Sequence, residues 1–170
     1  MRIEPATPAD LPAILAITND VIATSTAIYA DDPATLADRT AWFAARQAQG
    51  YPVLVARADG QVLGFASFGD FRPWPGYRYT VEHSVHVHAQ ARGKGIGHAL
   101  VAALFPYALS CGKHVMIAGV DATNTASLRL HTRLGFVQVA KFREVGRKFG
   151  RWLDLVFLQR FLDPPGSPRP

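Results

Sequence analysis

The stretch QARGKGIGHALV, residues 90–101, constrains this chain more than any other feature, because three glycines alternate with a lysine and an isoleucine just before an apolar run. A segment rich in β-branched residues, 79–87, precedes it, so the pattern predicts a strand that turns through glycines into a helix. Unpaired N–H groups at a helix start bind anions, and Arg92 and Lys94 add charge-assisted hydrogen bonds to phosphate oxygens. The stretch therefore predicts a phosphate-binding loop, with an unliganded flexible turn as the alternative.

The glycine spacing disfavours two common phosphate-binding motifs. A nucleoside-triphosphate loop reads GxxxxGK followed by Ser or Thr, and the sequence contains no such run. A dinucleotide fingerprint reads GxGxxG, but Gly93-x-Gly95 leads to His98 and Gly95-x-Gly97 leads to Leu100. The ligand is therefore expected to be another phosphate-bearing small molecule.

Composition predicts one globular domain over residues 1–162 of the 170, because 49% of the residues are hydrophobic and 18% are charged. Residues 163–170, which are rich in proline, are expected to be a disordered tail. The net charge of +5 permits an anionic ligand, but the basic residues are scattered, so we expect no nucleic-acid partner. We expect no membrane association, since no apolar run reaches spanning length. A single cysteine, Cys111, suits the reducing cytoplasm.

Hydrophobic periods and turn residues predict the order β-α-α-β-β-β-α-β-α-β-β, an α/β fold (an α+β mixed sheet) with helices on its faces. Thr7 is expected to cap a first helix that begins at Pro8, and Pro33 to begin a second that ends near Gly50. The remaining predicted elements are the hairpin strands 52–57 and 62–68, the loop 70–78, the strand 79–87, a helix reaching residue 110, the strand 114–120, the helix 124–135 and the closing strands 136–142 and 151–161.

Two motifs together resemble the GNAT superfamily of N-acetyltransferases. Arg92-x-x-Gly95-x-Gly97 is similar to its acetyl-CoA motif, and Asn124-Thr-Ala-Ser127, followed by Leu134-Gly135-Phe136, is similar to its second cofactor segment. The resemblance extends over residues 1–162 and implies the GNAT acyl-CoA N-acyltransferase fold, with acetyl-CoA as cosubstrate and no metal. The cofactor-binding residues that it implies are Val85, His86, Val87, Arg92, Gly93, Lys94, Gly95, Ile96, Gly97, His98, Asn124 and Ser127.

Residues 71–85 and 147–159 narrow the resemblance to the phosphinothricin and methionine sulfoximine N-acetyltransferases. This branch acetylates the α-amino group of small amino-acid analogues, which here include methionine sulfone. The resemblance also implies a homodimer with its sites near the subunit interface. The alternatives are a GNAT enzyme that acetylates a peptide N-terminus, a polyamine or an aminoglycoside, and a non-catalytic CoA-binding sensor.

Acetyl transfer to an amine requires a base, an oxyanion donor and a proton for the departing thiolate. The resemblance makes Glu82 the expected base, although a salt-bridged strand carboxylate is the plain alternative. Val85 and Val87 are expected to pair with the pantetheine arm, and the N–H near Val85 to polarise the thioester carbonyl. His131 stands where many members of the family have a tyrosine that protonates the thiolate, so it is either this general acid or a structural histidine.

An amino-acid acceptor also needs a cation for its carboxylate, and the candidates are Arg72, which we prefer, and Arg78. Around Arg72, the expected substrate-binding residues are Trp74, Tyr77, Glu82, His83 and Ser84. The run HSVHVH, residues 83–88, is compatible with a metal site, but no further ligand cluster accompanies it, so we expect no metal.

Overall fold

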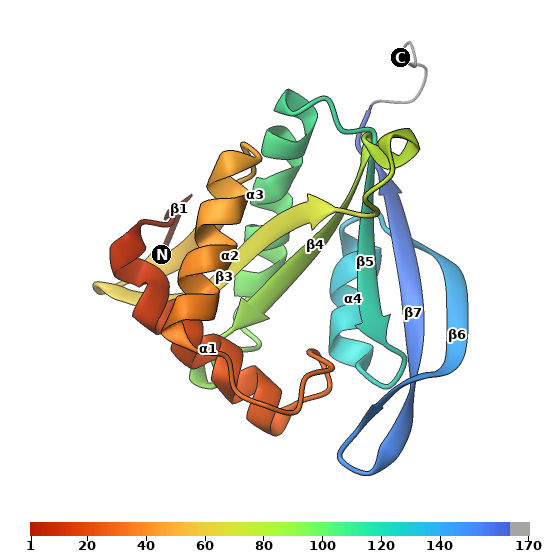
Figure 1. The fold of residues 1–170 in the computed structure, drawn as a ribbon, viewed down its shortest axis with the longest axis horizontal. Helices are drawn as coiled ribbons and strands as arrows, with labels where there is room; N and C mark the ends of the chain where they lie inside the picture. Colours follow the sequence, from red (N-terminus) through yellow and green to blue (C-terminus); the bar gives the residue numbers. More distant parts are fainter. Residues whose placement is uncertain (164–170) are drawn as a thin grey trace.

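The computed structural model describes residues 1–163, and the rest of the predicted tail lies outside the described residues. The predicted order of elements and the mixed α/β class are confirmed (Figure 1). The strands are β1 (Arg2–Pro5), β2 (Val53–Ala58), β3 (Gln61–Asp70), β4 (Thr80–Val87), β5 (Val115–Asp121), β6 (Val137–Lys148) and β7 (Arg151–Phe161). The helices are α1 (Leu11–Thr24), α2 (Leu36–Ala48), α3 (Ile96–Ser110) and α4 (Thr125–Arg133).

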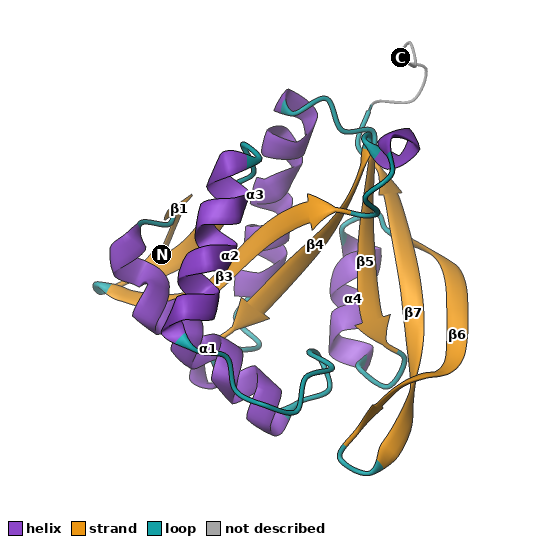
Figure 2. Cartoon of the chain, viewed as in Figure 1, coloured by secondary structure: helices purple, strands orange, loops and turns teal. Residues whose placement is uncertain are grey.

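The seven described strands form one sheet in the order β1-β2-β3-β4-β5-β7-β6. Helices α1 and α2 cover one face and α3 and α4 the other (Figure 2). Strand β2 shows how the sequence builds both layers, because Leu54 packs into the core on the α3 side while Val53 and Val55 pack under α1 and α2. Alternate residues of a strand point to opposite faces, so a strand buried on both sides reads as a continuous apolar run.

Strands β4 and β5 part after three paired residues, which opens the centre of the sheet. Their parallel pairing runs only from Thr80↔Val115 to Glu82↔Ile117. Beyond Glu82, β4 stays paired with β3 as far as Val87, while β5 pairs along its whole length with β7. Figure 1 shows the two strands diverging in this way. A gap therefore opens between β4 and β5, while each of them stays hydrogen-bonded to its other neighbour in the sheet.

The backbone direction of β4 shows which groups face this gap. The His88 N–H donates to the Leu63 carbonyl of β3, whereas the Tyr79 carbonyl accepts from the N–H groups of His114 and Val115 on the β5 side. Successive residues of a strand point their hydrogen-bonding groups to opposite neighbours. The N–H and C=O groups of Val85 and Val87 therefore face the open gap.

Three predicted boundaries were wrong by a few residues. Helix α2 begins at Leu36, not Pro33, because the Thr35 hydroxyl accepts from the Asp38 N–H at 3.2 Å and Asp38 accepts the Thr35 N–H at 2.7 Å, which completes a capping box. The predicted first helix starts as a 3₁₀ turn over Pro8–Asp10 before α1. The strand expected over 136–142 extends to Lys148 as β6, with irregular pairing to β7 between Phe142 and Gly146.

Candidate active site

Two connected clefts occupy the gap between β4 and β5. The first, here the outer cleft, has a volume of about 490 Å³ and lies between the end of β4, the glycine loop and α4. The second, here the inner cleft, has a volume of about 320 Å³ and reaches Glu82 on β4 and Gly119 on β5. Both are lined by Ala27, Val85, His86, Asn124 and Ser127. A molecule in the outer cleft can therefore present its end to the inner one.

The glycine loop leads into α3 at the mouth of the outer cleft, and its three glycines meet two different needs. Gly93 and Gly95 both have φ of 78°, a left-handed conformation that residues with a side chain rarely adopt. Gly97 is instead required by packing, because a Cβ there would lie 3.0 Å from Leu130 Cδ1 of α4. The loop thus exposes amides at the start of α3, and the last glycine lets α3 and α4 approach each other.

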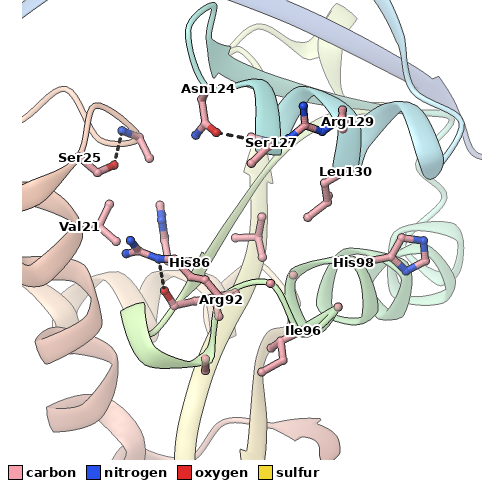
Figure 3. Close-up of a pocket in the computed structure, with 18 of the residues that line it drawn as sticks. Val21, Ser25, His86, Arg92, Ile96, His98, Asn124, Ser127, Arg129 and Leu130 are labelled. Carbon is pink, nitrogen blue, oxygen red and sulfur yellow. Dashed lines mark hydrogen bonds between the residues drawn. The ribbon is translucent and has the colours of Figure 1, made fainter.

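Arg92 is partly engaged within the protein. Its Nε donates to the Val87 carbonyl at 3.1 Å (Figure 3). Its Nη2 lies 3.3 Å from Asp20 Oδ2. The guanidinium therefore stands at the end of β4 and closes one side of the outer cleft. Of the predicted cofactor residues, all line this cleft except Lys94, which lies on a separate surface groove with Arg57 and His88.

Asn124 and Ser127 face Val21 and Ser25 across the outer cleft (Figure 3). Asn124 caps α4, since its Oδ1 accepts from the Ser127 N–H at 3.0 Å. His86 lies between these two sides and packs on Phe65, with ring centres 5.3 Å apart. Burial and then the charges of Arg39 and Arg92 lower the pKa of His86 to about 4, so its imidazole is neutral at neutral pH.

His83 and His131 form a buried pair at the inner cleft. Their Nε2 atoms lie 3.1 Å apart, and His131 Nδ1 lies 2.7 Å from the Ser127 carbonyl oxygen. A carbonyl only accepts, so His131 Nδ1 carries its proton, and in the neutral ring Nε2 accepts from His83. Burial lowers the pKa of both rings, which keeps the pair uncharged. The pair ties β4 to α4 beside the cofactor motif.

Glu82 is half-buried where the two strands part. A Cβ on Gly119 would lie 2.9 Å from Glu82 Oε1, so the bare glycine makes room for the carboxylate. The same position lies against the Phe157 and Leu155 side chains. Burial raises the pKa of Glu82, and the charge of Arg72 acts in the opposite direction. A carboxylate with a raised pKa inside a cleft is suited to accept a proton near neutral pH.

The expected substrate residues divide between the cleft and the loop outside it. His83 and Ser84 line the inner cleft with Glu82, whereas Arg72, Trp74 and Tyr77 line neither cleft among the described residues. Arg72 stacks on the Phe71 ring at 4.2 Å, and Tyr77 packs edge-on against the same ring. Trp74 is 73% exposed. The link between Arg72 and the inner cleft is therefore electrostatic: its positive charge acts on the Glu82 carboxylate.

Sequence reasoning missed one wall of the inner cleft. The segment between α1 and α2 contributes Thr26, Ala27, Ile28 and Tyr29, and the end of β5 contributes the buried Asp121. The segment has small and polar residues in no recognisable pattern, so it carries no motif. Within residues 1–163, no group of three or more His, Cys, Asp or Glu residues is arranged to hold a metal ion, and no helix is long and apolar enough to cross a membrane.

A glycine loop that exposes amides at a helix start, an open strand edge and a half-buried carboxylate beyond it define the class of protein. They are the parts of an enzyme that holds an extended, phosphate-bearing acyl donor and brings its end to an acceptor, which is a CoA-dependent acyltransferase. The model of the Acetyltransferase (GNAT) family matches residues 15–136. The chain belongs to the GNAT family of acetyltransferases, as the motifs predict.

Individual relatives are similar over nearly the whole chain. An L-methionine sulfoximine/L-methionine sulfone acetyltransferase of Pseudomonas paraeruginosa is 55% identical, covering 94% of this chain and 93% of the relative. A phosphinothricin N-acetyltransferase of Alcaligenes faecalis is 41% identical, covering 91% and 79%. The solved structure of the acetyltransferase yncA from Salmonella typhimurium, with its cofactor acetyl-CoA, superposes with a TM-score of 0.95 at 49% identity, covering 99% of this chain and 97% of that one.

Gly97 provides a test of the contact between α3 and α4. We expect Gly97→Val to weaken acetyl-CoA binding about ten-fold or more, because the added side chain meets Leu130 and pushes α4 away from the outer cleft. Isothermal titration calorimetry measures the affinity. Gly76→Val is the control, since a Cβ at Gly76 meets nothing within 4 Å. Equal affinities for the two variants would contradict the packing argument.

Proposed function

We propose that this enzyme transfers an acetyl group from acetyl-CoA to the α-amino group of small amino-acid analogues such as methionine sulfone, methionine sulfoximine and phosphinothricin. The observation that carries the proposal is the position of Glu82, which is half-buried in the inner cleft and within the influence of Arg72. A base in the inner cleft and a cation whose charge acts on it match the two ends of an α-amino acid. The names of the relatives support the same acceptor class.

Transfer is proposed to occur directly, with both substrates bound. Acetyl-CoA would occupy the outer cleft, and its pantetheine arm would pair with the backbone groups of Val85 and Val87 that face the gap, of which only the Val87 carbonyl already has a partner, Arg92. The acetyl carbonyl would then lie near the Val85 N–H, which stabilises the developing oxyanion. Cys111, the single cysteine, lies against the Gly50 carbonyl and lines neither cleft. No acyl-cysteine intermediate is therefore part of the proposal.

Glu82 is proposed to remove a proton from the acceptor amine. An α-amino group has a pKa of about 7.7–8.0, so a weak base suffices near neutral pH. The expectation that His131 protonates the thiolate remains a prediction. The hydrogen bonds of its two ring nitrogens, to Ser127 and to His83, favour the structural alternative.

A cationic acceptor, such as a polyamine or an aminoglycoside, is the second candidate. The specific observation in its favour is that Glu82 and Asp121 both line the inner cleft, whereas Arg72 does not. The Asp121 Oδ1 accepts from the Thr123 N–H at 2.7 Å and from the Thr123 hydroxyl at 2.8 Å, whereas its Oδ2 is buried with no hydrogen-bond partner among the described residues. The charge of Arg72 on Glu82 and the names of the relatives keep the amino-acid acceptor as the first candidate.

We further propose a homodimer in the cytoplasm, assembled through the β6–β7 hairpin. This hairpin exposes large apolar side chains at several positions along its length, and their exposed fractions lie between 44% and 66%. They are Val137, Val139, Phe142, Val145, Phe149 and Trp152. Apolar patches of this kind mark protein interfaces.

The first functional prediction concerns the base. Glu82→Gln should lower kcat by roughly 10²–10⁴-fold, because the amide accepts no proton, while acetyl-CoA affinity stays unchanged. In the unmodified enzyme, kcat/KM should rise with pH as Glu82 loses its proton, with an acid limb above the ordinary carboxyl range because burial raises this pKa. In the variant, only the titration of the acceptor amine should remain. Steady-state kinetics across pH measures both, and full activity in Glu82→Gln would contradict the role.

The acceptor class is tested by CoA thiol release with methionine sulfone, methionine sulfoximine, phosphinothricin, spermidine, an aminoglycoside and a short peptide. We expect turnover only with the three amino-acid analogues. Arg72→Met should raise their KM about ten-fold or more through loss of a charged contact to the carboxylate. Arg78→Met, which removes an arginine that stacks on Tyr79, is the control. Turnover confined to the cationic or peptide acceptors would contradict the proposal, and acetyl-CoA binding without turnover would favour the sensor alternative.

The dimer is tested by sedimentation velocity. Trp152→Glu places a charge on the exposed hairpin face and should convert the dimer to a monomer. Tyr107→Glu, on the exposed side of α3, is the matched control and should leave the mass unchanged. A monomeric unmodified protein, or a Trp152→Glu dimer, would contradict this interface.

A further inference from the structure

Lys148, at the end of β6, is a buried lysine to which the proposed chemistry gives no role. Only 2% of its surface is exposed, and its Nζ donates to the Ser25 carbonyl at 2.8 Å and to the Ile28 carbonyl at 2.7 Å. The Nζ also lies 4.9 Å from the centre of the Phe149 ring. A buried ammonium group is costly unless it is hydrogen-bonded, so these contacts indicate a specific task.

Both carbonyls belong to the segment between α1 and α2, and its first part, residues 25–31, is here called the acceptor loop. Thr26, Ala27, Ile28 and Tyr29 line the inner cleft, while only Ser25 and Ala27 reach the outer one. The loop contains no helix or strand, and its position therefore depends on contacts from outside it. Figure 1 shows the chain after α1 reaching past the open end of the gap toward β5 and β7.

Gly146, two residues before Lys148, provides a second contact with the same loop. A Cβ on Gly146 would lie 2.4 Å from Tyr29 Cδ2 and Cε2, so the Tyr29 ring packs directly on the bare backbone. Lys148 and Gly146 are both in β6. In the sheet, β6 lies on the β5 side of the gap, whereas β3, which pairs with Glu82, lies on the β4 side. The β6–β7 hairpin thus holds one wall of the inner cleft at two points.

We propose that Lys148 is a positioning residue for the acceptor substrate. By holding the Ser25 and Ile28 carbonyls, it keeps the acceptor loop at the distance from Glu82 at which an acceptor amine fits between them. The inference rests on the proposed function in assigning the acceptor to the inner cleft. Acetyl-CoA should be affected much less, because the outer cleft is built mainly by β4, α3 and α4.

The test compares Lys148→Met, which keeps the apolar stem and removes both hydrogen bonds, with Gly146→Ala, which displaces Tyr29 and leaves Lys148 in place. Each should raise the KM for methionine sulfone about ten-fold, while kcat and the KM for acetyl-CoA change less than about three-fold. Lys141 is an exposed lysine on β6, the strand of Lys148, and its ion-pair partner is Asp154 on β7. Lys141→Met should change neither KM. Unchanged acceptor KM in both test variants, or equal rises in both KM values, would overturn the proposal.

Hydrogen exchange gives a second readout that is independent of turnover. Peptides covering residues 25–31 of the substrate-free protein should exchange faster in Lys148→Met than in the unmodified protein, while those covering α3 stay unchanged. If the unmodified enzyme acetylates none of the panel but this exchange still rises, the proposed acceptor is wrong and the anchoring is supported. Unchanged exchange in residues 25–31 would overturn the anchoring itself. If Lys148→Met does not fold, Gly146→Ala decides both measurements.

Discussion

The parting of β4 from β5 is the constraint on which the rest of the structure depends. A strand inside a sheet normally satisfies its backbone groups on both sides, and β4 does so only as far as Glu82. Beyond that point, Arg92 satisfies the Val87 carbonyl, and the N–H and C=O of Val85 and the N–H of Val87 need a partner from outside the sheet. An extended ligand supplies one, in the way that a peptide adds to an open sheet edge. The glycine loop and the cap of α4 stand at the two sides of the same opening.

Buried polar groups hold the elements around this opening in place. The His83–His131 pair ties β4 to α4, and Lys148 ties β6 to the acceptor loop. His131 and Lys148 are hydrogen-bonded through their buried nitrogens, whereas His83 is neutral and its Nδ1 has no hydrogen-bond partner among the described residues. Glu82 differs from them, because its burial raises its pKa and no side-chain hydrogen bond offsets the change among the described residues. That contrast separates groups that position the site from a group that is ready to take a proton.

Residues that are close in the sequence were the easiest to interpret. Gly93, Gly95 and Gly97 act within one turn between a strand and a helix, and Asn124 caps the helix that follows it. Local geometry explains these patterns, which is why the cofactor loop and the order of elements could be predicted. The start of α2 was misplaced because Pro33 and Thr35 are both plausible starting points. The capping box of Thr35 with Asp38, together with the hydrogen bonds from Asn19 to the Ala34 backbone, decides between them.

The sequence by itself therefore determined the class of fold, the glycine turn that leads into α3 and the family, because each depends on short-range patterns. Only the tertiary structure decided that the charge of Arg72 acts on Glu82, that both ring nitrogens of His131 are hydrogen-bonded, and that residues 26–29 form a wall of the inner cleft. These relations join positions up to 123 residues apart, as in the hydrogen bond from Lys148 to Ser25. Contacts at such separations are set by how the layers pack on the divided sheet, and no local pattern records them.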